Sequence, residues 1–161
     1  MLPGIRSRLA AEESDCERRG TKVESEAMKA LRIWHGKFGV PVLGSPQAPS
    51  EERRNLRVEL IREECEEFAE ASRICDVTGA ADALADLLYV VYGAALEWGI
   101  PLDDVFAEVH RSNLSKVWPD GTVHCRQDGK VLKPPTYSPA DVAKVLKISA
   151  AEDLHASSAD E

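Results

Sequence analysis

The sequence has few of the residues that build disulfide frameworks or metal–thiolate centres. Its 161 residues include four cysteines, and none of them forms a C-x-x-C pair. This spacing gives no indication of a zinc knuckle, and we expect Cys65 and Cys75 to be small core residues on the apolar side of a helix. The di-iron type of helical bundle needs Glu-x-x-His on two helices, and the predicted helices carry no such pattern.

Long apolar segments are also lacking. We find no N-terminal apolar segment before a cleavage site, and no apolar run reaches the roughly 18 residues of a membrane span. The net charge of −8 argues against binding to nucleic acid or to a membrane surface. The length fits a single domain. We expect a protein of the reducing cytoplasm, or of the host cytoplasm if the chain is of phage origin.

What the chain does contain is a series of helical patterns from residue 22 onwards. Ser50 is a predicted N-cap for the second pattern, and Gly99 with Pro101 ends the third. A segment with two D-G pairs then predicts a hairpin or an ordered loop. The predicted helices span residues 22–39, 50–75, 82–98 and 102–116, with a short capped helix over 138–146.

These elements predict an all-α fold, a four-helix bundle followed by a C-terminal hairpin or loop and a short helix. We predict a mobile arm over 1–21, the folded domain over 22–148 and a disordered tail over 149–161. The third helix carries more apolar surface than one partner helix can cover. We therefore expect a second copy of the chain to complete the bundle.

Two aspartates stand on that apolar third helix, in the stretch DALADLLYVVYGAAL. On a helical wheel Asp82 and Asp86 share one line with Tyr89, whereas leucine and valine occupy the other sides. An isolated buried carboxylate is very costly and needs a cation. The chain has no Lys or Arg between Arg73 and Arg111, so the same helix cannot supply one.

The second helix has acids on its apolar side as well. Glu64 falls inside the apolar arc of the wheel, and Glu63 and Glu67 stand at its edge. A Glu-rich helix is by itself usually a solvated face. If the two helices pack with these faces together, however, five carboxylates converge and repel each other unless a divalent ion lies among them. Ligation by oxygen alone favours Mg²⁺ or Mn²⁺.

The segments LIREECEEFAEA, DALADLLYVVYGAALEWGIPLDDVFAEVHRSNLSK and DGKVLKPPTYSPADV resemble the MazG-like all-α nucleoside triphosphate pyrophosphohydrolases, in the phosphoribosyl-ATP-pyrophosphohydrolase-like branch. The resemblance covers about residues 24–147. It implies a homodimer or homotetramer that uses two or three Mg²⁺ or Mn²⁺ ions. It also implies cleavage of a (d)NTP between the α and β phosphates to give (d)NMP and pyrophosphate.

The resemblance also assigns residues. The family motif E-E-x-x-E falls on Glu63, Glu64 and Glu67, as metal ligands and catalytic residues, with Glu63 as the candidate base for the attacking water. The family motif E-x-x-D ends at Asp86. Here the sequence departs from the pattern, because Ala83 stands three residues before Asp86 and the acid is Asp82.

Nucleotide contacts are implied in three places. The motif HRSNLSK places Arg111, Asn113 and Lys116 where the family holds phosphate and ribose, and GKVLKPP adds Lys130 and Lys133. The first helix, near Trp34, His35 and Lys37, resembles the part that lines the base pocket. Without the resemblance, the three lysines from 116 to 133 are equally well read as ordinary surface residues.

Two functions are open at this point. The first is a metal-dependent pyrophosphohydrolase that controls the nucleotide pool, with a dGTP-like purine or dUTP among the candidate substrates. The second is a non-catalytic helical module for dimerisation or nucleotide sensing. The acids on both central helices favour the enzyme.

Overall fold

The computed structural model of the protein describes residues 24–147, so the predicted arm and tail lie outside the described residues. The described part is helical, which confirms the all-α prediction. Its helices are α2 (Glu26–Phe38), α3 (Glu51–Arg73), α4 (Val77–Glu97), α5 (Leu102–Leu114) and α6 (Val142–Leu146). The predicted hairpin is an irregular loop between α5 and α6, in which Cys125 and Val131 form an isolated antiparallel bridge.

Local capping sets the helix ends close to where the sequence places them. The Ser50 side chain accepts a hydrogen bond from the Arg53 amide, as predicted for the N-cap of α3. Helix α4 starts earlier than predicted, at Val77, because the Asp76 side chain accepts hydrogen bonds from the amides of Thr78 and Gly79. Residues 76–81, which lie between the second and third predicted helices, are therefore an N-cap followed by the first turn of α4.

Gly99 ends α4 for two reasons that both require glycine. Its φ is 64°, in the left-handed region, and a Cβ atom there would lie 2.1 Å from the Ser45 carbonyl oxygen. The loop after α2 runs along the end of α4, where the Leu43 amide donates to the Leu96 carbonyl at 2.9 Å. The close approach of this loop explains why no side chain fits at position 99.

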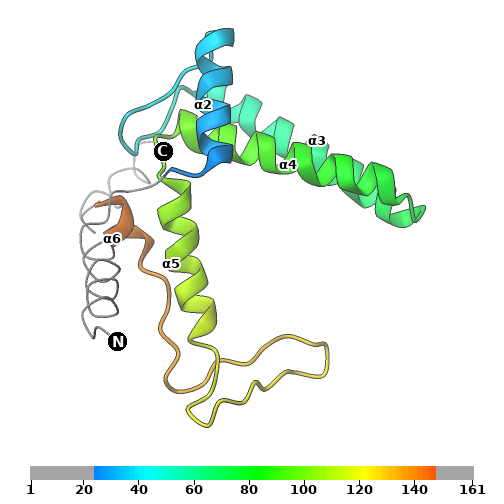
Figure 1. Ribbon diagram of the computed structural model, residues 1–161, viewed down its shortest axis with the longest axis vertical. Helices are drawn as coiled ribbons and strands as arrows, with labels where there is room; N and C mark the ends of the chain where they lie inside the picture. Colours follow the sequence, from blue (N-terminus) through cyan, green and yellow to red (C-terminus); the bar gives the residue numbers. More distant parts are fainter. Residues whose placement is uncertain (1–23, 148–161) are drawn as a thin grey trace, which may run out of the picture.

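The helices form an open arrangement (Figure 1). Helices α3 and α4 lie side by side and antiparallel as a long arm, and α2 crosses the arm at the end where α4 finishes. Helix α5 points away from the arm, with α6 beside it. The buried core at the crossing is small and consists of Met28, Leu31 and Leu96, with Tyr92 and Leu102 packed against them.

Much of the apolar surface of the arm is exposed. Leu84, Leu88 and Tyr89 on α4 expose 45%, 58% and 40% of their surface, because α3 covers only one side of α4. Cys65 and Cys75 are exposed, so the prediction that they are core residues was wrong. By length and composition alone α4 could cross a membrane, but it packs along α3 and carries Asp82 and Asp86.

Candidate active site

The acidic residues singled out in the sequence lie on the two helices of the arm. Glu63, Glu64 and Glu67 are in the middle of α3, and Asp82 and Asp86 are in the first half of α4. Because α3 and α4 pack together along their length, the two sets meet across the hairpin. The predicted convergence of the five carboxylates depends on these two helices packing side by side, and that packing is present.

Glu64 is the centre of this group. Its Oε2 atom is buried and lacks a hydrogen-bond partner among the described residues. The pKa of the Glu64 carboxyl is raised, first by desolvation and then by repulsion from the other four acids, Glu67, Asp86, Glu63 and Asp82. A buried carboxylate oxygen without a hydrogen-bond donor is costly. A cation bound to Glu64 would offset this cost.

The four acids around Glu64 are exposed. Arginine on α3 neutralises other acids instead, since Arg62 pairs with Glu59 and Arg73 pairs with Glu70. Within residues 24–147 no three acids, histidines or cysteines are already close enough to hold a metal ion. The group is thus an open fan of carboxylates rather than a closed cage.

The chemistry of this fan fits a hard divalent cation. Every donor is a carboxylate oxygen, the ligand type that Mg²⁺ and Mn²⁺ prefer. Mg²⁺ is usually held by one or two carboxylates together with water and substrate phosphates, so an open fan suits it better than a complete protein cage would. The Oε2 atom of Glu64, which has no hydrogen-bond partner among the described residues, is a carboxylate oxygen that could bind such a cation.

A buried ion-pair network fixes the base of the arm. The Glu97 carboxylate on α4 is fully buried and accepts hydrogen bonds from Arg57 and Arg53 on α3, with the Nε atoms at 2.9 and 2.8 Å. Burial opposes ionisation, but the two arginines outweigh it and lower the pKa of Glu97. A Cβ atom on Gly93 would lie 2.9 Å from Arg57 Nη1, so the arginine reaches Glu97 only because position 93 has no side chain.

Sequence reasoning missed this network. Its signal was a glutamate at the end of the apolar helix, together with two arginines one turn apart near the start of α3. Only the pairing of the two helices makes them partners.

Of the predicted base-pocket residues, His35 is buried, with 1% of its surface exposed. Its Nδ1 lies 3.2 Å from the Pro41 carbonyl oxygen and its Nε2 lies 3.5 Å from Arg57 Nη2. Burial, together with the Arg57 charge, lowers the pKa of His35, although the Pro41 carbonyl opposes the shift. His35 therefore joins α2 to the ion-pair network, and its predicted contact with a nucleotide stays a prediction.

Trp34 is part of an aromatic group that is partly open to solvent. It stacks on Phe38 with ring centroids 4.5 Å apart and meets Tyr89 edge-on at 6.0 Å. Phe38 is 66% exposed, and Tyr89 follows Asp86 by one turn of α4. This group, with the exposed Lys37 beside it, brings flat apolar surface next to the acidic fan.

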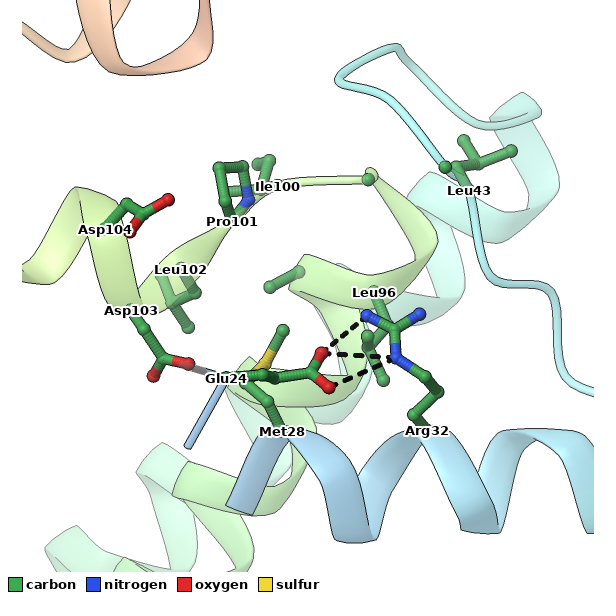
Figure 2. Close-up of a pocket in the computed structure, with 13 residues that line it drawn as sticks. Glu24, Met28, Arg32, Leu43, Leu96, Ile100, Pro101, Leu102, Asp103 and Asp104 are labelled. Atoms are coloured by element: carbon green, nitrogen blue, oxygen red, sulfur yellow. Dashed lines mark hydrogen bonds and ion pairs between the residues drawn. The ribbon is translucent and has the colours of Figure 1, made fainter. Parts of the chain in front are cut away.

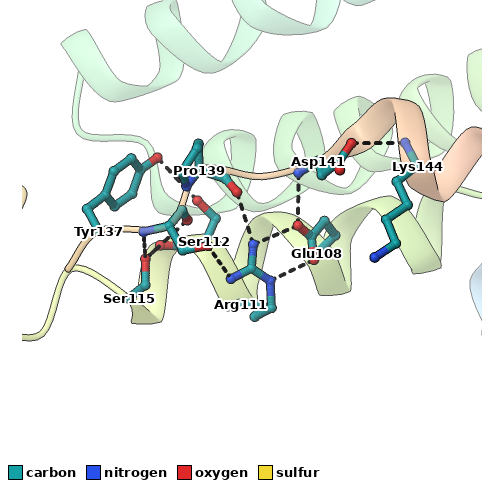
Figure 3. Close-up of polar contacts among 9 residues, drawn as sticks. Glu108, Arg111, Ser112, Ser115, Tyr137, Pro139, Asp141 and Lys144 are labelled. Atoms are coloured by element: carbon teal, nitrogen blue, oxygen red, sulfur yellow. Dashed lines mark hydrogen bonds and ion pairs between the residues drawn. The ribbon is translucent and has the colours of Figure 1, made fainter. Parts of the chain in front are cut away.

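The remaining predicted contacts lie on α5 and the segment that returns to it. Figure 3 shows Arg111 holding this segment: its guanidinium donates to the Ser138 side chain and the Pro139 carbonyl, both at 3.0 Å, and to Glu108. Arg111, with the Asp141 amide, lowers the pKa of Glu108 to about 2. The contacts of Arg111 thus anchor the C-terminal segment, and its predicted grip on phosphate stays a prediction.

Three predicted lysines differ in their surroundings. Lys116 Nζ donates to the Asn113 side chain at 2.6 Å, and Lys133 Nζ lies 4.3 Å from the centroid of the Tyr137 ring. Lys130 is exposed in the loop, near the D-G turn at Gly129. Because the Tyr137 hydroxyl in turn accepts a hydrogen bond from Ser112 on α5 at 3.2 Å, Lys133 lies on the same surface as Asn113 and Lys116, at the end of α5.

The acidic fan and this lysine surface stand apart within one chain. The extensive helix contacts of the described part are α3 with α4, α2 with α4, and α5 with α6. Figure 1 shows α5 and the loop below the arm, directed away from it. The structure therefore brings the acids together and the lysines together, but does not bring one set to the other.

A pocket of about 290 Å³ lies elsewhere, where α2, α4 and the start of α5 meet. Figure 2 shows Met28, Leu96 and Leu102 in its lining, with Glu24 paired to Arg32 beside them. Its lining includes none of the predicted metal or nucleotide residues. This pocket therefore belongs to the packing at the base of the arm.

Comparison with known proteins agrees with the geometry. A search of curated proteins finds no match to the chain. The sequence profile of the phosphoribosyl-ATP pyrophosphohydrolase family matches residues 32–113, a little over half of the chain. The match runs from α2 to the end of α5 and includes the whole arm with its five acids. By this match and by its all-α fold, the chain belongs to the phosphoribosyl-ATP pyrophosphohydrolase family, within the MazG-like all-α pyrophosphohydrolases.

Proposed function

We propose that the protein is a metal-dependent nucleoside triphosphate pyrophosphohydrolase of the cytoplasm. It cleaves a (d)NTP between the α and β phosphates to (d)NMP and pyrophosphate and so controls the nucleotide pool. The observation that carries the proposal is the buried Oε2 of Glu64, which has no hydrogen-bond partner within residues 24–147 and is repelled by four further carboxylates. Membership of a pyrophosphohydrolase family supports the same reaction class.

The carboxylates of the fan have separate roles in this proposal. Glu64, Glu67 and Asp86 hold Mg²⁺, or Mn²⁺ in its place, and Asp82 and Glu63 add further ligands for a second or third ion. When bound, the ions supply Lewis-acid polarisation of the phosphate oxygens and lower the pKa of water. Glu63 is exposed at the edge of the fan, so an oxygen of its carboxylate that is not used in ligation can take the proton of the attacking water.

Binding of the nucleotide falls to the other residues. Lys116, Lys130 and Lys133 stabilise the charge on the leaving pyrophosphate, and Asn113 and Arg111, on α5, add further contacts to the nucleotide. The aromatic group of Trp34, Phe38 and Tyr89 offers a stacking surface for the base, which every base can use. Lys37 stands beside this surface, and the buried His35 holds α2 in place.

The proposal requires more than one chain. The lysine surface and the acidic fan stand apart in the single chain, so a second copy must bring its lysines to the fan of the first. The exposed apolar side chains of the arm, among them Leu84 and Leu88, favour such a copy, because apolar patches of this kind usually lie in interfaces. A homodimer or homotetramer with two-fold symmetry satisfies both requirements.

The test is release of pyrophosphate from a panel of common and deaminated (d)NTPs, including dGTP and dUTP, with and without Mg²⁺. We expect stoichiometric (d)NMP and pyrophosphate, and loss of both products when the metal is chelated. Release of orthophosphate instead would place the cleavage at another bond. Nucleotide binding without any turnover across the panel would replace the enzyme by the non-catalytic nucleotide-sensing module.

A further inference from the structure

Tyr137 connects the C-terminal segment to α5 at a buried position. The hydroxyl of Ser112, which is 4% exposed, donates a hydrogen bond to the Tyr137 hydroxyl at 3.2 Å. The Tyr137 amide donates to the Pro134 carbonyl at 3.0 Å, which closes a tight turn, and Pro134 is itself buried. The Tyr137 ring is thus fixed at both its backbone and its hydroxyl end.

Two lysines surround this fixed ring. Lys133 Nζ lies over its face at 4.3 Å from the centroid, a cation–π distance. Lys116 lies in the turn directly after α5, four residues beyond Ser112, and its amide donates to the Asn113 carbonyl at 3.1 Å. The Ser112 hydrogen bond lowers the pKa of Tyr137, and the positive charges of Lys133 and Lys116 lower it further.

Each lysine is restrained by a different neighbour. Asn113 accepts a hydrogen bond from Lys116 Nζ at 2.6 Å, and the Tyr137 ring holds Lys133. Two ammonium groups held side by side repel each other, and an anion with several negative charges relieves that repulsion. Free lysine side chains lose considerable rotamer entropy on binding, and this loss is smaller when they are held in place beforehand.

From this juxtaposition we infer that Tyr137 is a positioning residue for the phosphate chain of the substrate. It holds Lys133 beside Lys116, so that the two ammonium groups form one site for a pyrophosphate or triphosphate group. The inference rests on the proposed function and extends it, because it names the residue that makes two separate surface lysines act together.

Docking of the C-terminal segment by itself does not require Tyr137. Arg111 already binds the segment at Ser138 and Pro139, and the Ser138 amide donates to the Ser115 side chain at 2.9 Å. These contacts lie after Tyr137 in the chain and do not involve its ring. Substitution of Tyr137 should therefore leave the segment docked while it releases Lys133.

The test is titration of the full-length protein with inorganic pyrophosphate, without divalent metal, by isothermal calorimetry. We expect Lys133→Ala and Tyr137→Leu each to raise the Kd about tenfold, the value of one charge-assisted hydrogen bond. The double variant should bind no more weakly than Lys133→Ala alone, because Tyr137 acts only by holding the ammonium group that Lys133→Ala removes. Tyr137→Phe and Ser112→Ala both retain the aromatic ring at position 137 but remove the hydrogen bond between Ser112 and Tyr137. Each should raise the Kd a few-fold.

Lys29→Ala, which removes one positive charge from α2, is the matched control and should leave the Kd unchanged. Losses from Tyr137→Leu and Lys133→Ala that add in the double variant would overturn the inference, as would an unchanged Kd in Tyr137→Leu or no binding of pyrophosphate to the wild type. If Tyr137→Leu does not fold, the pair Tyr137→Phe and Ser112→Ala decides the question.

The same variants separate this inference from the proposed function. In turnover assays Tyr137→Phe should raise KM for the triphosphate and leave kcat nearly unchanged. Binding of pyrophosphate does not depend on hydrolysis, so a protein without turnover still tests Tyr137 by calorimetry. Normal hydrolysis together with a Kd insensitive to Tyr137 would refute the positioning role alone.

Discussion

Glu97 on α4 and Arg57 on α3 form a buried ion pair, with Arg57 Nε 2.9 Å from Glu97 Oε1. Glu97 is fully buried and Arg57 is 8% exposed. His35 on α2 contacts Arg57, with its Nε2 atom 3.5 Å from Arg57 Nη2. Three helices therefore meet at one charged group. Because this point fixes how α3 lies on α4, it also fixes how the carboxylates further along the arm face each other.

Glu97→Gln should destabilise the protein strongly. The substitution keeps the shape but leaves the buried guanidinium of Arg57, and the partly buried one of Arg53, without a counter-charge, which costs about 3–5 kcal/mol. Urea denaturation measures the loss. Glu59→Gln is the control, because it breaks the exposed pair with Arg62 and should cost no more than about 0.5 kcal/mol. Equal losses in the two variants would contradict a structural role for the network.

His35 should make stability depend on pH below neutrality. Its pKa is lowered in the folded protein, so the unfolded chain takes up a proton first as the pH falls below about 6.5. The contribution of neutral His35 to the free energy of unfolding is complete above that pH. It is lost as the pH falls towards the folded pKa, with a slope of at most about 1.4 kcal/mol per pH unit. Urea midpoints at pH 7.5, 6.5 and 5.5 measure it. His35→Gln should flatten this dependence of stability on pH. The control is His110→Gln, at an exposed position, which should leave the dependence unchanged.

Glu64→Gln should abolish metal-dependent turnover while the fold is kept. Lewis-acid stabilisation is worth several kcal/mol, and each 1.36 kcal/mol is a factor of ten, so we expect a loss of at least about 100-fold. The metal-free variant should also unfold at higher urea, because one charge leaves a repelling group. Glu66→Gln removes an equal charge from an exposed residue of α3 outside the fan and should keep full activity. Wild-type activity of Glu64→Gln at saturating Mg²⁺ would rule out the metal site.

Mixed oligomers should be more active than their parent variants at substrate concentrations well below KM, where weakened binding in Lys133→Ala lowers the rate about tenfold. If the lysines of one chain serve the acids of another, Lys133→Ala and Glu64→Gln chains mixed at equal amounts should recover about a quarter of wild-type activity, since half of two-fold dimers are mixed and each has one intact site. Refolding the mixture from urea lets the chains exchange. Light scattering should give a dimer or tetramer at micromolar concentration. Oligomers without recovery would place each site within one chain, and an active monomer would refute the assembly.

The helix ends were predictable because their causes are local. Ser50 caps the helix that follows it, and Gly99 has the left-handed conformation that a non-glycine residue rarely adopts. The start of α4 was predicted five residues late for the same kind of reason. Asp76 is as good an N-cap as Ser50, but the Thr-Gly pair after it has low helix propensity and therefore favours a turn in the sequence pattern.

The acidic fan was also predictable in part. Glu64 lies inside the apolar arc of α3 on a helical wheel, and its side chain has a buried oxygen in the structure. The wheel needs only the period of the helix, which the sequence supplies. The Glu64→Gln variant tests whether these positions are metal ligands.

The sequence by itself determined the all-α class, the helices and the acids that share a helix face, because each depends on residues within a few turns of one another. Only the tertiary structure decided that Glu97 pairs with Arg57 across 40 positions of sequence, that His35 is buried, and that Arg111 is engaged by Ser138 and Pro139. It also decided that Cys65 is exposed, since a wheel identifies an apolar side but not which part of it a neighbour covers. These outcomes depend on how helices far apart in the chain pack together, and helix packing is set by the whole set of side chains rather than by any local pattern.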